Sequence, residues 1–503
     1  MTEKTENSGF IYRFLNAIET KGNKMIDPIT LFFLLCVAVV AVSGLLGFLD
    51  VSAIHPKDGS IVKVVSLLQK NQLQNYLSAI VSSFQGFPPM AMVLIVMIGV
   101  GVAEKSGLMD AALHRAVSGI PKAIVTPVII FIGIVSNVAG DAGFIVLPPL
   151  SALVFLSVGR HPLIGLFASY SGVAAGFCAN IMIGLSDVLA ASFTIPSAQL
   201  IDPTYMATPA MNYYFLFIST FVLTIAGTII TEKIIAPRYA NQPLSQFKKT
   251  SLAPKEVEVK ALKWAGISLI IYLLFIVFLC LGKNPFLADE QGSILGLKAP
   301  FMAGIIPIVT VMFLLPGLVY GKIAGTIKRD KDAVIMMGKS MSEMGPYIVL
   351  AFFAAQFLAL FTFSNLGVIL AIKGAAFLSN IGLTGYGLLI AFILFASFVN
   401  LFIGSASAKW AILAPIFVPM FLLLGQDPAL TQAAYRIGDS VTNPLSPLFP
   451  YMPILLSYIA LYKKDSGFGT IVSNMLPYSV IFLIVWVIML TLWTALGIPL
   501  GPK

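Results

Sequence analysis

The chain has 503 residues, of which 58% are hydrophobic and only 11% are charged, whereas soluble globular proteins average about 25% charged residues. This composition excludes a soluble enzyme or binding module and predicts an integral, multi-span membrane protein. The net charge of +9 does not indicate nucleic-acid binding, because the Lys and Arg residues lie mainly in short loops, where they set membrane topology. The histidines are scattered, which argues against a multi-histidine metal centre.

Apolar runs near the length of a bilayer span, roughly 20 residues, recur along the chain. The predicted spans in chain order are 28–49, 88–102 and 213–230, then 264–281, 300–320, 346–363 and 476–498. The first run follows a polar N-terminus and is read as a retained span rather than a cleaved signal. The segments between them are a polar, partly amphipathic stretch at 50–85, interfacial helices at 104–122 and 365–379, a basic linker at 232–263 and a basic loop at 322–339.

Two pairs of short apolar arms flank turns that are too polar and glycine-rich for ordinary membrane helix. The sequence SNVAGDAG joins the first pair and NLFIGSASAKW the second, and each pair precedes a long segment with an interruption. If each pair forms a re-entrant hairpin with no net crossing, the basic linker falls on the cytoplasmic side, as the positive-inside rule favours. The hairpins are expected at 123–158 and 386–424, and the broken helices at 162–193 and 428–462.

This arrangement predicts an all-α protein with nine transmembrane helices and two re-entrant hairpins, a cytoplasmic N-terminus and a C-terminus outside. An internal repeat supports it, because seven residues recur at a constant offset of 266 positions. Pro149, Phe155, Leu156, Gly159, Pro162, Ala168 and Gly172 recur as Pro415, Phe421, Leu422, Gly425, Pro428, Ala434 and Gly438. The first repeat is expected to occupy 1–231 and the second 264–503, in opposite orientations. Inverted repeats of this kind place the substrate near the bilayer midplane, at the discontinuous helices.

Ionisable residues at membrane depth are costly and therefore mark candidate functional sites. Arg436 and Asp439 are three residues apart, so on a helix they share a face and can form a structural ion pair. Alternatively, Arg436 binds a substrate carboxylate through its planar guanidinium, and Asp439 binds a cation or carries a proton. Asp187, in the motif GLSDVLA, lies at the break of the first repeat and is either functional or a helix cap.

The hairpin tips carry hydroxyls, side-chain amides and freed carbonyls, which are hard oxygen ligands that suit Na⁺, while nearby helix N-termini suit an anionic group. The tip residues are Ser136, Asn137, Asp141 and Ser405. The alternative is that these polar turns only close the hairpins. Trp410 can stack on an aromatic ring or act as an interfacial anchor, and Lys409 is expected to face water in the cavity.

The sequence also bears on three other classes of function, which are a soluble-type enzyme, an intramembrane protease and a channel. The chain has no catalytic motif in a fitting context, so it is not expected to be an enzyme. An intramembrane protease would need Asp187 and Asp439 within a few ångströms of each other, and would leave the symmetric hairpins unexplained. A channel would need a continuous pore, whereas hairpins entering from opposite faces suit gates that never open together.

The chain resembles the p-aminobenzoyl-glutamate transporter (AbgT) family over essentially its whole length, most specifically in SASAKW, QDPALTQAAYRIGDSVTNPLSP and GLSDVLA. The resemblance implies a homodimer in the bacterial cytoplasmic (inner) membrane, with an architecture like that of the ion-transporter superfamily, in which an outer, hairpin-bearing core moves like an elevator against a dimeric scaffold. It implies a substrate path lined by Asp187, Ser407, Trp410, Pro428, Arg436 and Pro447, and a Na⁺ site that contains Asn400 and Asp439.

The family resemblance also implies the solute. Members take up p-aminobenzoyl-glutamate or export sulfonamide antimetabolites, so a cation-coupled transporter is expected, with Na⁺ or H⁺ as the coupling ion and no bound cofactor. The alternative is a proton-driven exporter of sulfonamide-type antimetabolites on the same fold. For p-aminobenzoyl-glutamate, Arg436 would hold a carboxylate, Trp410 would stack on the aromatic ring, and Asp187 would accept the hydrogens of the amine.

Overall fold

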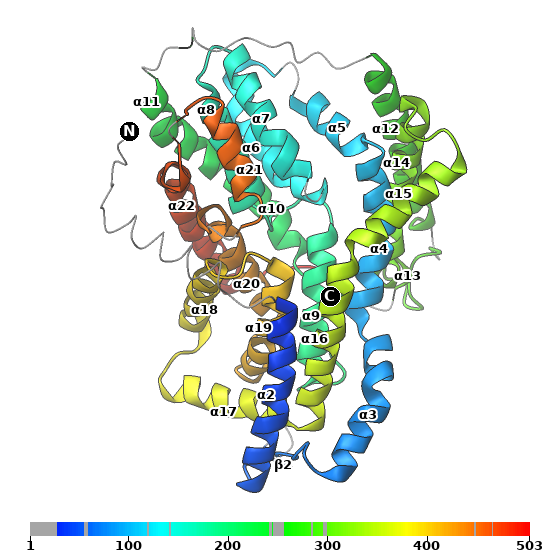
Figure 1. The fold of residues 1–503 in the computed structure, drawn as a ribbon, viewed down its shortest axis with the longest axis vertical. Helices are drawn as coiled ribbons and strands as arrows, with labels where there is room; N and C mark the ends of the chain where they lie inside the picture. Colours follow the sequence, from blue (N-terminus) through cyan, green and yellow to red (C-terminus); the bar gives the residue numbers. More distant parts are fainter. Residues whose placement is uncertain are drawn as a thin grey trace, which may run out of the picture.

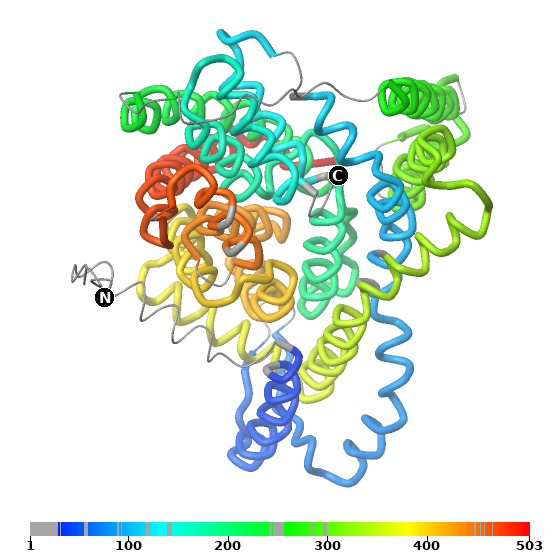
Figure 2. Tube along the Cα trace, turned by 45° about the horizontal axis from the view of Figure 1, so that its top comes forward, coloured from blue at the N-terminus to red at the C-terminus, as the bar shows by residue number. Residues whose placement is uncertain are grey.

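The computed structural model describes residues 28–54, 59–117, 120–139, 142–240, 244, 256–282, 285–294, 299–446, 449–464 and 466–502. Helices account for most of this part of the chain (Figure 1). In both views, one side of the molecule is formed by α4 (Pro88–Lys105), α12 (Glu256–Leu279), α14 (Ile305–Ala324) and α15 (Asp330–Glu343) (Figures 1 and 2). The opposite side is formed by α18 (Gly385–Asn400), α20 (Pro428–Thr442) and α22 (Phe468–Ala495). Between them lie α9 (Leu185–Gln199), α16 (Gly345–Phe363) and α19 (Ala406–Leu423).

The N-terminal part packs against the middle of the chain. It consists of α2 (Pro28–Phe48), β1 (Ser52–Ile54), β2 (Ile61–Lys63), α3 (Lys70–Gln85), α4 (Pro88–Lys105) and α5 (Leu108–Val117). Helix α2 packs on α16, and α4 packs on α9, α14 and α15. Strands β1 and β2 pair antiparallel, with Ala53 opposite Val62. This short ribbon departs from the expected all-α fold, which the mostly helical described chain otherwise matches, and it is too brief to give a recognisable alternating pattern.

The first hairpin and broken helix follow. They comprise η1 (Lys122–Ile124), α6 (Val125–Val135), η2 (Ser136–Ala139), α7 (Ala142–Ser157), α8 (Pro162–Tyr170), the π-helical turn η3 (Ser171–Ala175) and α9 (Leu185–Gln199). Helices α6 and α7 are the two expected arms. The expected interruption lies at 176–184, where the chain leaves the helical path before α9 begins. Single π-helical turns are frequent at functional sites.

The middle of the chain contains the longest apolar helices. These elements are α10 (Tyr213–Ile230), η4 (Thr231–Ile235), α11 (Ala236–Tyr239), α12 (Glu256–Leu279), α13 (Pro300–Ala303), α14 (Ile305–Ala324), α15 (Asp330–Glu343), α16 (Gly345–Phe363) and α17 (Leu366–Asn380). One expectation needs correction here. The basic loop at 322–339 is largely helical, since α15 begins at Asp330 with the Asp332 carboxylate accepting from the amide of Arg329.

The second hairpin and broken helix complete the fold. They comprise α18 (Gly385–Asn400), α19 (Ala406–Leu423), α20 (Pro428–Thr442), η5 (Asn443–Leu445), α21 (Met452–Ala460) and α22 (Phe468–Ala495). Helix α18 packs on α20, and α19 packs on α9, α17 and α20. In the other unit, α7 packs on α8 and also contacts α21. The hairpin helix α19 therefore contacts α9, and the hairpin helix α7 contacts α21. In each case the contacted helix is the C-terminal half of the other unit's broken helix.

Residues that match between the two units occupy equivalent places. Gly159 and Gly425 end α7 and α19 with φ of +76° and +79°, a conformation that glycine adopts without strain. Pro162 and Pro428 each stand at the first position of a helix, where the missing N–H removes no hydrogen bond. These parallels agree with the internal repeat. The opposite orientation of the units in the bilayer stays a prediction.

The matching glycines also allow the same close approach. A Cβ added to Gly172 would lie 2.6 Å from the carbonyl oxygen of Ile130 in α6, and one added to Gly438 would lie 2.6 Å from that of Ile393 in α18. In each unit the first arm of the hairpin therefore packs directly on the backbone of the broken helix. This contact fixes the hairpin tip relative to the helix break.

Apolar side chains are exposed on the outside of the helix assembly. Phe275 and Phe278 of α12 are 54% and 69% exposed, for example. Six helices in the described ranges are long and apolar enough to cross a membrane, or seven if α17 and α18, between which the chain bends by 115°, form one broken span. Such faces suit the hydrocarbon core of a bilayer. The count of nine spans and the sidedness of the termini stay predictions.

The close approach at Gly438 generates a test of the packing. Gly438→Ala should destabilise the protein by about 1–3 kcal/mol, the usual effect of overpacking, because the new methyl group meets the Ile393 carbonyl. Thermal unfolding of the detergent-solubilised protein measures the effect. Gly338→Ala in α15 is the matched control, since its Cβ would meet no described atom within 4 Å. Equal melting temperatures for the two variants would contradict the proposed contact.

Candidate functional site

A pocket of about 290 Å³ lies where the two hairpin tips meet the two helix breaks. This volume is near the lower end of small-molecule sites. The hairpins contribute Asn137, Phe144, Ser405, Ser407 and Trp410, the breaks contribute Phe177, Cys178, Phe449 and Tyr451, and α20 contributes Tyr435, Arg436 and Asp439. The polar segments that stand out in the sequence are thus brought together around one cavity.

Arg436 forms a buried ion pair with Asp187 across the two repeats. Its Nη1 lies 2.6 Å from Asp187 Oδ1, and the side chains are only 2% and 6% exposed. The other carboxylate oxygen of Asp187 accepts a hydrogen bond from the amide of Gly184 at 2.7 Å, which caps α9. Asp187 is therefore a helix cap and the partner of Arg436 at once.

A second buried ion pair joins Lys409 to Asp439. Lys409 Nζ lies 2.6 Å from Asp439 Oδ1, with side-chain exposures of 1% and 0%. The alternative that Arg436 and Asp439 form a structural ion pair with each other is therefore wrong, and so is the expectation that Lys409 faces water. The spacing along α20 shows only which residues share a face. Asp439 pairs with Lys409 of α19, and Arg436 pairs with Asp187 of α9.

Asn400 closes this second pair at the end of α18. Its Oδ1 accepts a hydrogen bond from Lys409 Nζ. Its Nδ2 donates to the backbone oxygen of Asp439 at 2.5 Å and to Asn443 Oδ1 at 2.9 Å. The two predicted Na⁺ ligands, Asn400 and Asp439, thus do converge on one cationic centre. In this structure that centre is the ammonium group of Lys409.

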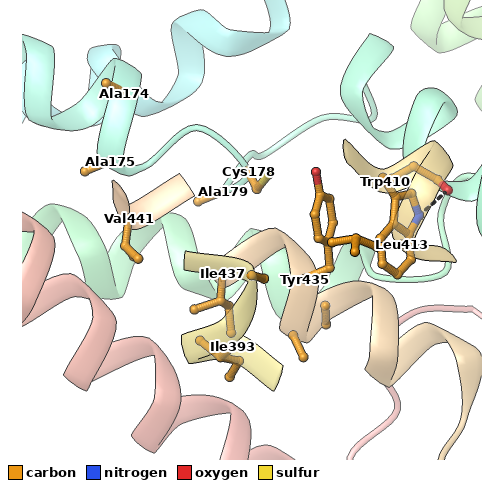
Figure 3. Packing of buried hydrophobic residues seen from close by; sticks show 14 of the residues in the cluster. Ala174, Ala175, Cys178, Ala179, Ile393, Trp410, Leu413, Tyr435, Ile437 and Val441 are labelled. Atoms are coloured by element: carbon orange, nitrogen blue, oxygen red, sulfur yellow. Dashed lines mark hydrogen bonds between the residues drawn. The ribbon is translucent and has the colours of Figure 1, made fainter. Parts of the chain in front are cut away.

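Trp410 is held rigidly beside the pocket. Its ring stacks on Tyr435, with centroids 4.3 Å apart and planes 20° from parallel, and Figure 3 shows the two rings together. The indole N–H donates to the carbonyl of Ala190 at 3.1 Å and to Thr194 Oγ1 at 2.9 Å. Because Trp410 is 1% exposed, it is not an interfacial anchor. One face of its ring is already covered by Tyr435.

Aromatic side chains from both units line the same pocket. Phe144 of α7 stacks on Tyr451 with a centroid distance of 4.1 Å and an interplanar angle of 6°. Phe449 meets Phe144 edge-on at 5.3 Å, and Phe177 lies 6.3 Å from it. Sequence reasoning missed all four, since an aromatic residue gives little contrast in an apolar chain. The positions of Phe177, Phe449 and Tyr451 at or near helix breaks were the available signal.

Several predicted site residues fall elsewhere or outside the description. Pro428 is buried at the start of α20, away from the pocket lining, and Ser136 bonds its own turn through the Gly133 carbonyl at 2.7 Å. Asp141 and Pro447 lie outside the described residues. Asp187 and Asp439 each pair with a different basic side chain. That arrangement does not fit a protease dyad, in which two carboxylates share a proton.

The two ion pairs predict a specific pattern of energetic coupling. Removing one partner of a buried pair costs about 3–5 kcal/mol, because the remaining charge is uncompensated. Asp187→Asn and Arg436→Gln should therefore each lower thermal stability, and the double variant should lose less than the sum, with a coupling of about 0.5–3 kcal/mol. Lys409→Met and Asp439→Asn should behave likewise.

A double-mutant cycle between Arg436 and Asp439, which do not form an ion pair with each other, serves as the control for the cycles of the two ion pairs. Arg436→Gln combined with Asp439→Asn should show clearly weaker coupling than either contacting pair. A cycle in which Arg436 couples more strongly to Asp439 than to Asp187 would contradict the observed pairing.

Comparison with known proteins identifies the family. Residues 13–503 match the AbgT putative transporter family. The p-aminobenzoyl-glutamate transport protein of Escherichia coli (strain K12) is 37% identical over 499 residues, which cover 99% of this chain and 97% of that protein.

Two solved structures have the same fold over nearly the whole chain. The YdaH transporter of Alcanivorax borkumensis has a TM-score of 0.91 at 38% identity, covering 94% of this chain and 100% of its own. MtrF of Neisseria gonorrhoeae, from a class of antimetabolite efflux pumps, has a TM-score of 0.91 at 40% identity, covering 97% and 99%. With this extent of similarity in sequence and fold, the chain belongs to the AbgT family of transporters.

Proposed function

We propose that this protein is a cation-coupled secondary transporter that moves p-aminobenzoyl-glutamate, or a related aromatic amino/carboxylate solute, across the bacterial cytoplasmic membrane. The observation that carries the proposal is the pocket at the two hairpin tips, which combines a buried arginine with a lining of aromatic rings. An arginine fork suits a carboxylate, and aromatic rings suit an aminobenzoyl group. The E. coli relative, named for this solute, supports the same assignment.

Arg436 is the proposed carboxylate ligand. Its Nη1 is engaged by Asp187, whereas its Nη2 makes only long contacts, 3.3 Å to the Cys178 carbonyl and 3.4 Å to Ser186 Oγ. Its Nε has no hydrogen-bond partner among the described residues. The edge formed by Nε and Nη2 therefore remains for a solute carboxylate. Asp187 is already engaged twice, so its role is to position Arg436 rather than to accept the solute amine.

The charge balance of the site supports cation coupling. Among the buried residues of the described chain, Lys409 and Arg436 balance Asp187 and Asp439, so the site is neutral before solute arrives. p-Aminobenzoyl-glutamate is a dianion, and each charge moved against the membrane potential involves about 2.3 kcal/mol per 100 mV. Import therefore needs more than two co-transported monovalent cations if net charge movement is to favour uptake.

A proton-driven exporter of sulfonamide-type antimetabolites is the second candidate. The 40% identity to an antimetabolite efflux pump favours it, and a neutral pocket also suits a neutral drug. In both candidates, the hairpin-bearing part of a homodimer would move like an elevator against the rest, and the N-terminus would be cytoplasmic with the C-terminus outside.

Transport by the purified protein in proteoliposomes separates the candidates. Labelled p-aminobenzoyl-glutamate should accumulate when a Na⁺ or proton gradient is imposed, and protein-free liposomes give the background. Proton-driven movement of a sulfonamide, with no flux of p-aminobenzoyl-glutamate, would replace the first candidate with the second. Ion conduction without any solute flux would instead favour a channel.

Arg436→Lys tests the carboxylate ligand without removing the charge that balances Asp187. The variant should fold, and its KM for the solute should rise by about 10–100-fold, since a hydrogen bond to a charged group contributes roughly 1.5–3 kcal/mol. Arg160→Lys is the matched control, because Arg160 pairs with Glu232 at 2.8 Å and does not line the pocket. An unchanged KM for Arg436→Lys would exclude Arg436 as the carboxylate ligand.

Phe144→Leu tests the aromatic lining. The loss of one aromatic partner, worth about 0.5–1.5 kcal/mol, should raise the KM for an aminobenzoyl solute by roughly 2–10-fold. Phe398→Leu on the outer surface of α18, where the side chain is 58% exposed, should leave the KM unchanged. If both variants transport like the unmodified protein, the aromatic lining does not contribute to recognition.

A further inference from the structure

We propose that the ammonium group of Lys409 is a built-in occupant of the coupling-cation site, and that Na⁺ binds there only by displacing it from Asn400 and Asp439. The displaced ammonium then becomes available to the anionic solute in the pocket. This inference rests on the cation coupling proposed above and adds the residue that links ion binding to solute binding.

The first observation is the convergence of two oxygen ligands on one nitrogen. Lys409 Nζ lies 2.6 Å from Asp439 Oδ1 and also donates to Asn400 Oδ1. A carboxylate and an amide oxygen are hard ligands of the kind that bind Na⁺. An ammonium group and a Na⁺ ion carry the same charge, so the two are alternative occupants of one position.

The orientation of Asn400 shows that its oxygen is directed at the cation. Its Nδ2 is surrounded by three acceptors, which are the Asp439 carbonyl at 2.5 Å, Thr442 Oγ1 at 2.9 Å and Asn443 Oδ1 at 2.9 Å. A flipped amide would place its oxygen among these acceptors and its donors against the ammonium. The surrounding residues therefore hold Asn400 as a cation ligand whichever cation is present.

The second observation is that the pair is incomplete and lies next to the pocket. Asp439 lines the pocket, yet its Oδ2 has no hydrogen-bond partner among the described residues although it is buried. A purely structural ion pair would be expected to satisfy both carboxylate oxygens, since an unsatisfied buried acceptor costs free energy. A bound Na⁺, which takes several oxygen ligands, can use both oxygens.

Lys409 also has a short route out of the site. It lies in the first turn of α19, next to the tip residues Ser405 and Ser407, both of which line the pocket. The flexible four-carbon side chain of Lys409 can move its ammonium group from Asp439 into this cavity. Entry of Na⁺ thereby adds one positive charge to the pocket, where a solute carboxylate binds beside Arg436. This mechanism therefore requires that Na⁺ binds before the solute.

The effect of Na⁺ on thermal unfolding of the purified full-length Lys409→Met variant tests the inference. A ligand that binds only the folded state raises the melting temperature. The variant should therefore melt at a higher temperature in NaCl than in choline chloride of equal ionic strength. Its Na⁺ concentration for half-maximal stabilisation should be at least about tenfold lower than that of the unmodified protein. Equal Na⁺ dependence in the two proteins would overturn the proposal.

The double variant Lys409→Met/Asp439→Asn is the matched control, because it lacks both the occupant and its charged ligand. It should show no stabilisation by Na⁺ relative to choline, and stabilisation equal to that of Lys409→Met would place the ion elsewhere and overturn the proposal. No solute is present in these measurements. A failure of the transport assay described above is therefore distinguishable from a failure of this inference.

A measurement on the unmodified protein keeps the proposal testable if Lys409→Met does not fold. Lys409 is 1% exposed when paired with Asp439, so an amine-reactive reagent should modify it slowly in choline chloride. NaCl should increase its rate of modification, as followed by mass spectrometry, whereas the exposed Lys63 should react equally in both salts. A rate for Lys409 that does not respond to Na⁺ would contradict displacement.

Discussion

The neutralisation of charge on α20 is the constraint on which the site depends. Arg436 and Asp439 are both almost fully buried on this helix, and each is balanced by a residue from another element. Burying an unpaired charge costs several kcal/mol, so Asp187 in α9 and Lys409 in α19 must stay close. Helix α20 is thereby tied to the first helix break on one side and to the second hairpin tip on the other.

The sequence predicts the helices and breaks better than the contacts between them. Prolines and glycines at matching positions, such as Gly159 and Gly425, mark turns that the structure reproduces. The partners of Arg436 and Asp439 were not predictable, because the spacing within one helix says nothing about cations supplied from elsewhere in the fold. Helix α15 was also missed, since its polar residues resemble a loop when a local cap such as Asp332 is not recognised.

The aromatic part of the pocket was hidden for a different reason. Phe144 and Tyr451 lie far apart in sequence, on the first hairpin and after the second break, and stack only because α7 packs on α21. Polar residues in an apolar chain stand out, so Asn400, Ser407 and Arg436 could be selected from the sequence alone. Aromatic residues do not stand out in this way, and their role emerges only when the two units are brought together.

Because the charges of the site already balance, recognition of an anionic solute in the proposed mechanism depends on the binding of a co-transported cation. The pocket is lined by Arg436 and Asp439, each already paired with an opposite charge behind it, so it offers an anionic solute no net attraction. The solute must therefore share a basic side chain that is already paired, or bind together with an additional cation. Asp187 holds Arg436 in place but also competes for it. A co-transported cation that takes the place of Lys409 beside Asp439 would relieve this competition by freeing a second positive group. On this view, the ion that drives transport also completes the binding site for the solute.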